Sequence, residues 1–385
     1  MTRKLLILLF ATVLPFSLFA IRPGDAAPEL EVLKWIKGDQ IAMTFAAKNK
    51  NIVVIEFWAT WAPLCKETMP MLTDLQKKYS DKGVVVISIS TEDEKTVSGF
   101  INDRKYIGHR IAIDDTKKTY KKYMEADPGI PAVFVIGKGG EMLWKGHPME
   151  LDAVLEKVVN GKFDIKVQKK ISLLHDDLKR AMEKDNQGLV SQIADDVLEL
   201  DPSDDIALRC KLYYFERRNL PGEALAFLNK LQKKIPGHFP FYSVELGILD
   251  KTDASADEKM KVYEKALLVF KDDPDNLTSL SWMISDNMSF GTGSVKFSLV
   301  AALRAKEILP VDASGRRKGL CLNALARAYY NAGCIEQAIK VQQEAVGSFS
   351  GYDEEEGSKT LLKYYQEALD IWKKLIPDGS NSGKK

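Results

Sequence analysis

The sequence lacks the residues that metal sites and disulfide frameworks require. Its 385 residues include only four cysteines and four histidines. The histidines, His109, His147, His175 and His238, are scattered, with no cysteine or carboxylate at the spacing of a zinc motif. Neither a glycine-rich phosphate loop nor a nucleophile elbow is present in the sequence. We therefore predict no metal site and no cofactor.

An excess of charge of one sign is also lacking. Lysine and arginine number 55, aspartate and glutamate number 54, and the formal net charge is +1. A nucleic-acid-binding domain needs a basic face, so we expect no nucleic-acid partner. A hydrophobic content of 45% and a charged content of 28% are typical of a soluble globular protein. The length suits two or three domains.

Long apolar runs are confined to the N-terminus. One covers residues 5–20 behind Arg3 and Lys4, and its 16 residues fall short of the ~20 that span a bilayer. The run ends on small residues, so residues 1–20 predict a cleaved export signal, with an uncleaved anchor as the alternative. We expect an exported, periplasmic protein with no membrane span in the mature chain.

The cysteines are not arranged as a disulfide framework. Cys65 is alone in the first half of the chain, whereas Cys210, Cys321 and Cys334 fall in the second half. Cys321 and Cys334 are separated by a predicted helix and its turn, which places them roughly 15–20 Å apart. We expect buried, unpaired thiols at these three positions.

The first half of the chain alternates predicted strands and helices. The apolar runs NIVVIEF and GVVVISIS predict buried strands, with a helix at 63–80 between them. Farther on, GIPAVFVI, the turn KGG and EMLWKGHP predict a hairpin, and residues 151–160 predict a closing helix. This order predicts an α/β domain over residues 21–165, with a mixed sheet and flanking helices.

The second half is predicted to be entirely helical. Strand signals stop after about residue 163, and helix-closing prolines follow at positions 202, 236, 274 and 310. Their spacings are close to the 34-residue period of paired helices that marks a tetratricopeptide solenoid. We predict such a solenoid over residues 166–375, followed by a polar, disordered tail at 376–385.

Two units of this half have the expected tetratricopeptide register. Their matching residues are Leu208, Leu212, Phe215, Ala224, Leu228 and Pro236 in one, and Leu322, Leu325, Ala326, Tyr329, Gly333 and Ala338 in the other. The second half therefore resembles the tetratricopeptide family. That resemblance implies a concave surface that binds peptides or partner proteins.

Several motifs of the first half resemble the thioredoxin superfamily, in particular its exported TlpA-like disulfide reductases. The lead-in GDAAPELEVLKWIKGDQ is similar to that family's N-terminal hairpin, and VVIEFWATW is similar to the strand before its active site. Cys65, followed by Met69 and Pro70, matches the helix after the site. GIPAVFVI matches the segment whose cis-proline faces the site. The resemblance covers about residues 24–163.

The resemblance implies an active site from which one cysteine is missing. The family's first thiol stands at a helix N-terminus, where free N–H groups and the helix dipole stabilise a thiolate. The second thiol follows three residues later and resolves the mixed disulfide. In FWATWAPLC the first position is Ala62 and the second is Cys65, which excludes dithiol exchange. A peroxidase is also excluded, because Ala62 and Trp58 replace the threonine and proline of peroxiredoxins.

The sequence leaves open the roles of Cys65 and Glu56. Cys65 is an inert structural thiol, a partner in mixed disulfides or a catalytic group. Glu56 matches the buried acid that helps deprotonate the second cysteine of thioredoxins. It is a proton acceptor for Cys65 or a relic, either neutral or paired with a lysine.

The resemblance also implies a groove beside the active site that can bind a peptide without thiol chemistry. The resemblance implies a peptide-binding groove formed by Trp61, Ala62, Pro63, Ile130 and Pro131, with a cis bond before Pro131. The first hypothesis is an exported adaptor or chaperone-like protein that binds protein or peptide clients and has lost dithiol exchange. The alternative is a thiol-disulfide oxidoreductase that acts through Cys65 alone. Whether the protein is an enzyme is thus undecided, and a structural role in an envelope complex is a third hypothesis.

Overall fold

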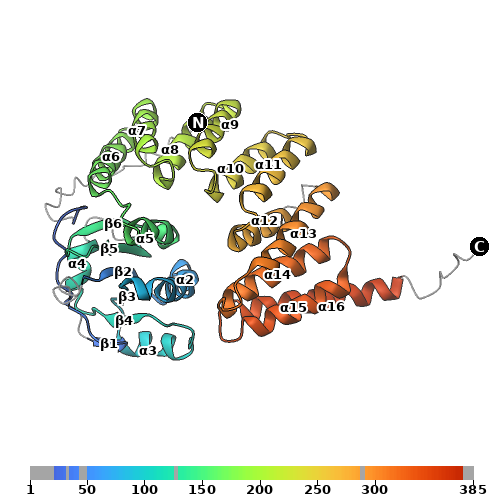
Figure 1. Cartoon of the computed structure of the whole chain (residues 1–385), viewed down its shortest axis with the longest axis horizontal. Coiled ribbons are helices and arrows are strands. Elements are labelled where there is room, and N and C mark those ends of the chain that lie inside the picture. Colours follow the sequence, from blue (N-terminus) through green and yellow to red (C-terminus); the bar gives the residue numbers. More distant parts are fainter. Residues whose placement is uncertain (1–20, 32–33, 43–49, 125–128, 287–290, 376–385) are drawn as a thin grey trace, which may run out of the picture. The chain divides into compact units, whose positions relative to one another are not determined.

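The computed structural model describes residues 21–31, 34–42, 50–124, 129–286 and 291–375. The chain divides into two compact units, Met1–Lys169 and Lys170–Lys385 (Figure 1). The division falls within helix α6 (Ile165–Glu183), at whose start we had predicted the domain boundary. The predicted export signal at 1–20 and the predicted tail at 376–385 lie outside the described residues.

The first unit is built on a six-stranded mixed sheet in the order β1-β4-β3-β2-β5-β6. The strands are β1 (Lys34–Lys37), β2 (Ile52–Trp58), β3 (Val84–Ser90), β4 (Arg110–Ile113), β5 (Ala132–Ile136) and β6 (Met142–Gly146). Strand β3 pairs in parallel with β2 and β4, whereas β1, β5 and β6 are antiparallel to their neighbours. This confirms the predicted α/β fold with its closing hairpin.

Strand β2 is buried along its whole length because helices cover both faces of the sheet. The helices are α2 (Pro63–Tyr79), α3 (Glu94–Asn102), α4 (Lys118–Met124) and α5 (Leu151–Val159). Figure 1 shows α4 on one face and the other three on the opposite face. Val54 belongs to the cluster that includes residues of α2 and α5, and Phe57 to the cluster that includes residues of α4. Alternate residues of one apolar strand therefore supply both cores.

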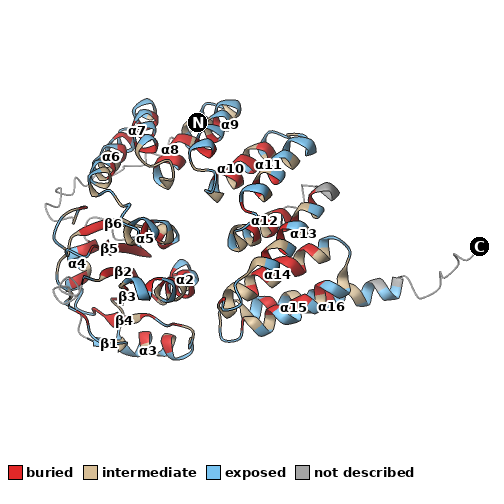
Figure 2. Cartoon of the chain, viewed as in Figure 1, coloured by how far each residue is buried: buried red, intermediate tan, exposed pale blue. Residues whose placement is uncertain are grey.

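The second unit consists of helices throughout its described residues, which confirms the predicted all-α half. They are α7 (Gln187–Leu200), α8 (Asp205–Arg217), α9 (Pro221–Lys234), α10 (Phe239–Lys251), α11 (Ala256–Val269), α12 (Pro274–Asp286), α13 (Gly291–Ile308), α14 (Gly315–Asn331), α15 (Ile335–Ser348) and α16 (Glu355–Leu375), together with most of α6. Figure 2 shows buried residues along one side of these helices and exposed residues along the other. Such amphipathic helices need a neighbour against which to bury their apolar side.

Contacts between residues about one predicted period apart recur in the helical unit. Lys234 Nζ lies 2.6 Å from Glu199 Oε2, and the tyrosine hydroxyls of Tyr330 and Tyr364 lie 3.2 Å apart, at sequence separations of 35 and 34 residues. Successive units are therefore stacked in similar register, as expected for a helical repeat. Ala338, one of the residues in the expected tetratricopeptide register, is fully buried in a core cluster that includes residues of α14 and α15.

All four cysteines are free thiols, which confirms the predicted unpaired state. Cys65, Cys210 and Cys321 are buried, but the predicted burial is wrong at Cys334, which is half-buried because it caps the start of α15. Within the described ranges, no helix combines the length and the apolar composition that crossing a membrane requires.

A glycine in α14 provides a test of the helical packing. A Cβ at Gly319 would lie 2.6 Å from Cε1 of the fully buried Phe349 ring. Gly319→Ala should therefore lower the free energy of unfolding by ~1–3 kcal/mol through overpacking. The matched control is Gly247→Ala in α10, where nothing lies within 4 Å, and it should raise stability by ~0.5–1 kcal/mol. Urea unfolding followed by circular dichroism measures both, and equal stability of the two variants would contradict the packing.

Candidate functional site

The start of α2 positions the residues of the predicted site. Strand β2 ends at Trp58, and the chain turns so that the Ala62 N–H donates to the Ala59 carbonyl at 3.2 Å. Ala62 is the N-cap residue, with extended backbone angles, and Pro63 occupies the first helical turn. Proline is favoured there because its missing N–H would have no helical partner. Ala62 thus stands at the N-terminus of the helix, where a thiolate would be most stabilised.

A carboxylate that the sequence analysis missed holds the turn before α2. Both the N–H and the hydroxyl of Thr60 donate to the Glu92 carboxylate at 2.7 Å, and the Ser90 hydroxyl donates to it at 3.1 Å. Glu92 lies just past the end of β3, and β2 and β3 are parallel neighbours that end at the same edge of the sheet. In the sequence, the only indication of this contact was the position of Glu92 two residues after the end of a predicted strand.

The predicted groove residues divide into exposed and buried groups. Trp61 is 69% exposed, and Pro63 is also exposed, whereas Ala62 is buried. Pro131 is buried, Ile130 is half-buried, and the peptide bond between them is cis, as the resemblance implies. Ile130 packs against the core cluster that contains Ala62.

Cys65 belongs to the same cluster and is fully buried. Burial raises the pKa of its thiol to about 12, and the negative charges of Glu56 and Glu92 act in the same direction. A hydrogen bond with the Ala59 backbone opposes this rise. At neutral pH the site therefore holds a protonated thiol, which is neither a nucleophile nor a metal ligand.

Glu56 lies on the face of β2 that α2 covers, close to Thr68 and Cys65 of that helix. Its carboxylate accepts hydrogen bonds from the Ser88 hydroxyl at 2.5 Å and the Thr68 hydroxyl at 3.1 Å. Burial raises the pKa of Glu56 to about 7, although both hydroxyls favour the charged form. Of the alternatives left open for Glu56, pairing with a lysine is not found in the described part of the chain, where these hydroxyls bond to the carboxylate. A hydroxyl fits between a strand and a helix with less desolvation than an ammonium group.

His109 extends this arrangement and is the second residue that the sequence analysis missed. Its Nε2 lies 2.9 Å from Ser88 Oγ, and its Nδ1 lies 3.0 Å from Thr73 Oγ1. Burial lowers the pKa of His109 to about 3, and the charge of Lys37 adds to the effect. His109 had no visible partner in the sequence because Glu56, Ser88 and Thr73 come from three separate elements.

Comparisons with known proteins identify the family of this chain. A family model described as the AhpC/TSA family matches residues 23–145. The thioredoxin-like protein YneN of Bacillus subtilis is 32% identical over 151 residues, which cover 38% of this chain and 81% of YneN. The chain belongs to the thioredoxin-like AhpC/TSA family. We call its first unit the thioredoxin-like domain.

Other relatives of the thioredoxin-like domain are thiol-disulfide proteins by name. The thiol-disulfide oxidoreductase ResA of Oceanobacillus iheyensis is 38% identical over 85 residues, which cover 21% of this chain and 44% of ResA, less than half of its length. A crystal structure of a putative thiol:disulfide interchange protein DsbE from Chlorobium tepidum has 21% sequence identity. It covers 38% of this chain and 100% of that chain, with a TM-score of 0.32.

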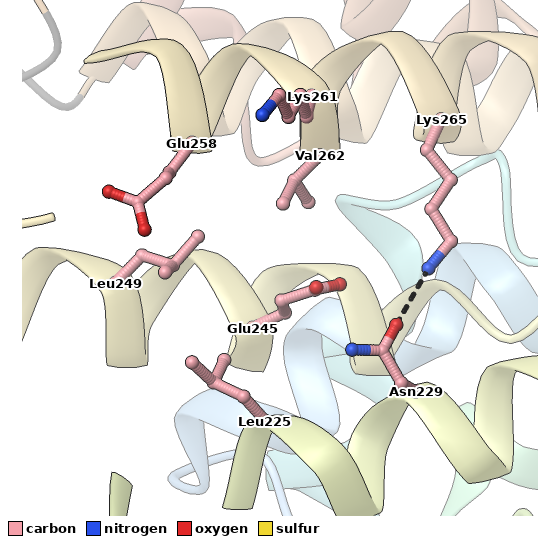
Figure 3. A pocket seen from close by; sticks show the side chains of 8 residues that line it. All are labelled: Leu225, Asn229, Glu245, Leu249, Glu258, Lys261, Val262 and Lys265. Carbon is pink, nitrogen blue, oxygen red and sulfur yellow. Dashed lines mark hydrogen bonds between the residues drawn. The ribbon is translucent and has the colours of Figure 1, made fainter. Parts of the chain in front are cut away.

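The helical unit contains a separate hollow of about 300 Å³ between α9, α10 and α11 (Figure 3). Its lining residues are Leu225, Asn229, Glu245, Leu249, Glu258, Lys261, Val262 and Lys265. Figure 3 shows the leucine and valine side chains facing one another across the hollow, with Lys265 reaching Asn229 at 3.2 Å. The lining of the hollow combines the apolar side chains of Leu225, Leu249 and Val262 with the buried carboxylate of Glu245, and the exposed Lys261 lies at its edge. Among the described residues of both units, no three His, Cys, Asp or Glu side chains are grouped to hold a metal ion.

The raised pKa of Glu56 should make stability depend on pH. Below its ordinary pKa of 4.5 both the folded and unfolded states are protonated. Between pH 4.5 and about 7 only the unfolded state loses the proton, so stability falls as pH rises. At about 1.4 kcal/mol per pH unit the loss totals ~3 kcal/mol. Glu56→Gln should lack this loss, so its stability relative to the native protein should rise between pH 5 and pH 8.

The matched control for this measurement removes a different carboxylate. Glu31 bonds to Lys122, which lowers the pKa of Glu31. Glu31→Gln should therefore show no relative gain above pH 5, because that carboxylate is charged in both states there. Chemical unfolding at each pH gives the free energies. A constant stability difference between native protein and Glu56→Gln from pH 5 to pH 8 would contradict the raised pKa.

Proposed function

We propose that this protein is an exported adaptor that binds protein or peptide clients and has lost dithiol exchange. The observation that carries the proposal is Ala62 at the N-terminus of α2, the position that a nucleophilic thiol needs. The family to which the thioredoxin-like domain belongs includes thiol-disulfide oxidoreductases. The proposal is that this chain keeps the scaffold of that family and uses it for binding.

The loss of exchange follows from the state of the single remaining thiol. Dithiol exchange needs a thiolate that attacks and a second thiol that resolves the mixed disulfide. Cys65 is fully buried, and the pKa of its thiol is about 12. At pH 7 only on the order of one molecule in 10⁵ would carry a Cys65 thiolate. The negative charges of Glu56 and Glu92 disfavour a further negative charge there.

Binding is supported by apolar side chains that the fold leaves on the surface beside Ala62. Trp61 is 69% and Leu64 is 53% exposed, and Pro63 between them is also exposed. We call these three residues the apolar rim. Apolar residues grouped on a surface mark binding sites for other chains, and tryptophan contributes strongly there. An extended, partly unfolded client with apolar side chains suits the rim.

The hollow in Figure 3 is a second candidate for client binding, in the helical unit. Its apolar interior, formed by Leu225, Leu249 and Val262, suits one apolar side chain of a bound segment. The exposed Lys261 at the edge of the hollow suits an acidic residue next to that apolar side chain in the bound segment. This arrangement accords with a tetratricopeptide-like solenoid, which we also propose for the helical unit.

Export to the periplasm is part of the proposal and rests on residues 1–20. Their basic start, short apolar run and small final residues are those of a cleaved signal.

The alternative function is oxidoreductase chemistry through Cys65 alone. It is favoured by the retention of Cys65, of the buried acid Glu56 beside it and of the cis Ile130–Pro131 bond. In that case Cys65 would form a mixed disulfide with a client cysteine or a small thiol, and a separate thiol would resolve it.

A disulfide-reduction assay separates the two functions. The native protein and Cys65→Ser should both reduce insulin no faster than the background. Ala62→Cys should be active, because a thiol at the helix N-terminus has a pKa near 7 and is about half ionised. Relative to Cys65, this is a rise in thiolate of on the order of 10⁴-fold or more at pH 7.

Each other outcome of the assay has a definite meaning. Native activity that disappears in Cys65→Ser would establish the alternative and overturn the proposal. An inactive but folded Ala62→Cys variant would show that more than one thiol has been lost from the site. Mass spectrometry of the oxidised Ala62→Cys variant should find a disulfide between the introduced thiol and Cys65 as its internal control.

A binding assay tests the apolar rim directly. Trp61→Ala should weaken binding of a reduced, carboxymethylated unfolded protein by about 5- to 30-fold, equivalent to ~1–2 kcal/mol. The matched control is Met149→Ala, since Met149 is also 69% exposed. Met149 lies three residues before Asp152, which bonds to Lys78 at the other end of α2. Equal affinities of the two variants, measured by fluorescence anisotropy of the labelled client, would remove the rim from the proposal.

A further inference from the structure

Four polar residues of the thioredoxin-like domain form a continuous hydrogen-bonded series from its interior to its surface. We call Glu56, Ser88, His109 and Thr73 the buried polar network. Successive links measure 2.5 Å, 2.9 Å and 3.0 Å between polar atoms. Glu56 and Ser88 have no exposed surface, and His109 has 2%. Thr73 is half-buried and bonds to the N–H of the exposed Gly108.

The ionised Glu56 carboxylate gives the network a direction, because it can only accept and so takes the Ser88 hydroxyl proton. The Gly108 N–H donates to Thr73 Oγ1 at 3.0 Å, and in this state the Thr73 hydroxyl donates its proton to His109 Nδ1. His109 then carries its proton on Nε2 and donates it to Ser88 Oγ. The Ser88 hydroxyl donates in turn to the ionised Glu56 carboxylate. Every donor points toward Glu56 in this state.

We propose that the buried polar network is a proton relay between Glu56 and the surface, in which protonation of Glu56 changes the tautomer of His109. When Glu56 is protonated, its O–H donates to Ser88 Oγ. The Ser88 hydroxyl then donates to His109 Nε2, and the His109 proton resides on Nδ1 and points to Thr73. All three links are kept, and each reverses its direction.

The transfer balances in protons and needs no redox partner. The Thr73 hydroxyl gives its proton to His109 Nδ1, and the Nε2 proton passes to Ser88. The former Ser88 proton passes to Glu56 Oε2, and water at the surface returns a proton to Thr73. One proton from the solvent is taken up, and the negative charge on Glu56 is neutralised. The reverse sequence releases the proton.

The surrounding charges favour a neutral histidine throughout this cycle. Lys37 of β1 lies close enough to lower the pKa of His109 further, and burial lowers it to about 3. On the side of α2, Glu56 is faced by Thr68 and interacts with the Cys65 thiol, which is protonated at neutral pH. Glu92 acts on Cys65 from the end of β3. Glu56 is therefore the group in the network that changes charge near neutral pH.

The relay goes beyond the proposed function, because it requires neither a client nor a reacting thiol. It gives a fully buried acid a path along which it equilibrates with solvent. A proton can thus enter or leave the space behind the start of α2 without opening of the fold. The charge beside Cys65 follows the pH of the surroundings through this path.

Nitrogen NMR of the native protein tests the relay directly. Protonated and unprotonated imidazole nitrogens differ widely in ¹⁵N chemical shift, so the shifts report the tautomer. The two nitrogens of His109 should exchange their shift positions between about pH 5 and pH 9. The midpoint of this change should equal the midpoint of the Glu56 titration, near pH 7, which ¹³C NMR of the labelled carboxyl group measures. In Glu56→Gln the His109 tautomer should not change with pH.

Assignment of His109 does not depend on a variant that disturbs the core. The three other histidines are half-buried, so His147→Gln, His175→Gln and His238→Gln each remove one signal and leave that of His109. Three results would overturn the relay. They are an unchanged His109 tautomer while Glu56 titrates, protonation of both His109 nitrogens in this pH range, and no titration of Glu56 between pH 5 and pH 9.

A second measurement tests the path itself. Thr73→Val keeps the shape of the side chain and removes the hydroxyl that connects His109 to the surface. Exchange of the His109 ring proton with solvent should slow by about tenfold, the effect of one lost hydrogen-bonded link. The matched control is Thr119→Val, which removes a buried hydroxyl bonded to the Glu31 N–H elsewhere in the domain. Equal exchange rates in both variants would overturn Thr73 as the exit of the relay.

Discussion

A carboxylic acid in the middle of a fully buried strand is the constraint on which the interior of the thioredoxin-like domain depends. Glu56 occupies a position of β2 where its neighbours Ile55 and Phe57 are entirely apolar. An isolated charge there would cost several kcal/mol, so the strand can be central only if other elements bring polar groups to it. Ser88 is its partner in the register of the parallel β2–β3 pair, and Thr68 reaches it from α2. The acid therefore helps to fix which residues of the second strand and the covering helix face it.

The geometry of the helix start and the chemistry of a thiol at that position depend on different interactions. The start of α2 is fixed by Pro63 and by the turn that Glu92 holds through Thr60, and none of these contacts involves a thiol. Ala62 is therefore compatible with this geometry of the helix start. Cys65 lies beside two carboxylates, whose negative charges help to raise the pKa of its thiol. Hydrogen bonds thus hold the turn before the helix, whereas burial and charge set the ionisation of the thiol.

The parts of the fold that the sequence predicts are those marked by patterns along the chain. The continuous apolar runs predict β2 and β3, the glycine-containing turn predicts the hairpin of β5 and β6, and the spacing of the helix-closing prolines predicts the helical second half. The buried polar network was not predictable in this way, because its linked residues are separated by 21 to 36 positions and meet only through sheet register and helix packing. His109 illustrates the difference. Along the chain it has no ligand-like neighbour, whereas in space it joins a serine of β3 to a threonine of α2.

The helical unit is the opposite case, since the spacing of its helices is visible in the sequence and its hollow is not. Contacts at separations of 34 to 36 residues recur in it, as expected for a helical repeat. Two side chains that line the hollow take part in this period, because Lys265 and Asn229 both line it and contact each other at a separation of 36 residues. Leu225, Leu249 and Val262 come from three consecutive helices. The packing of those helices brings the three apolar side chains together, which no local pattern of the sequence indicates.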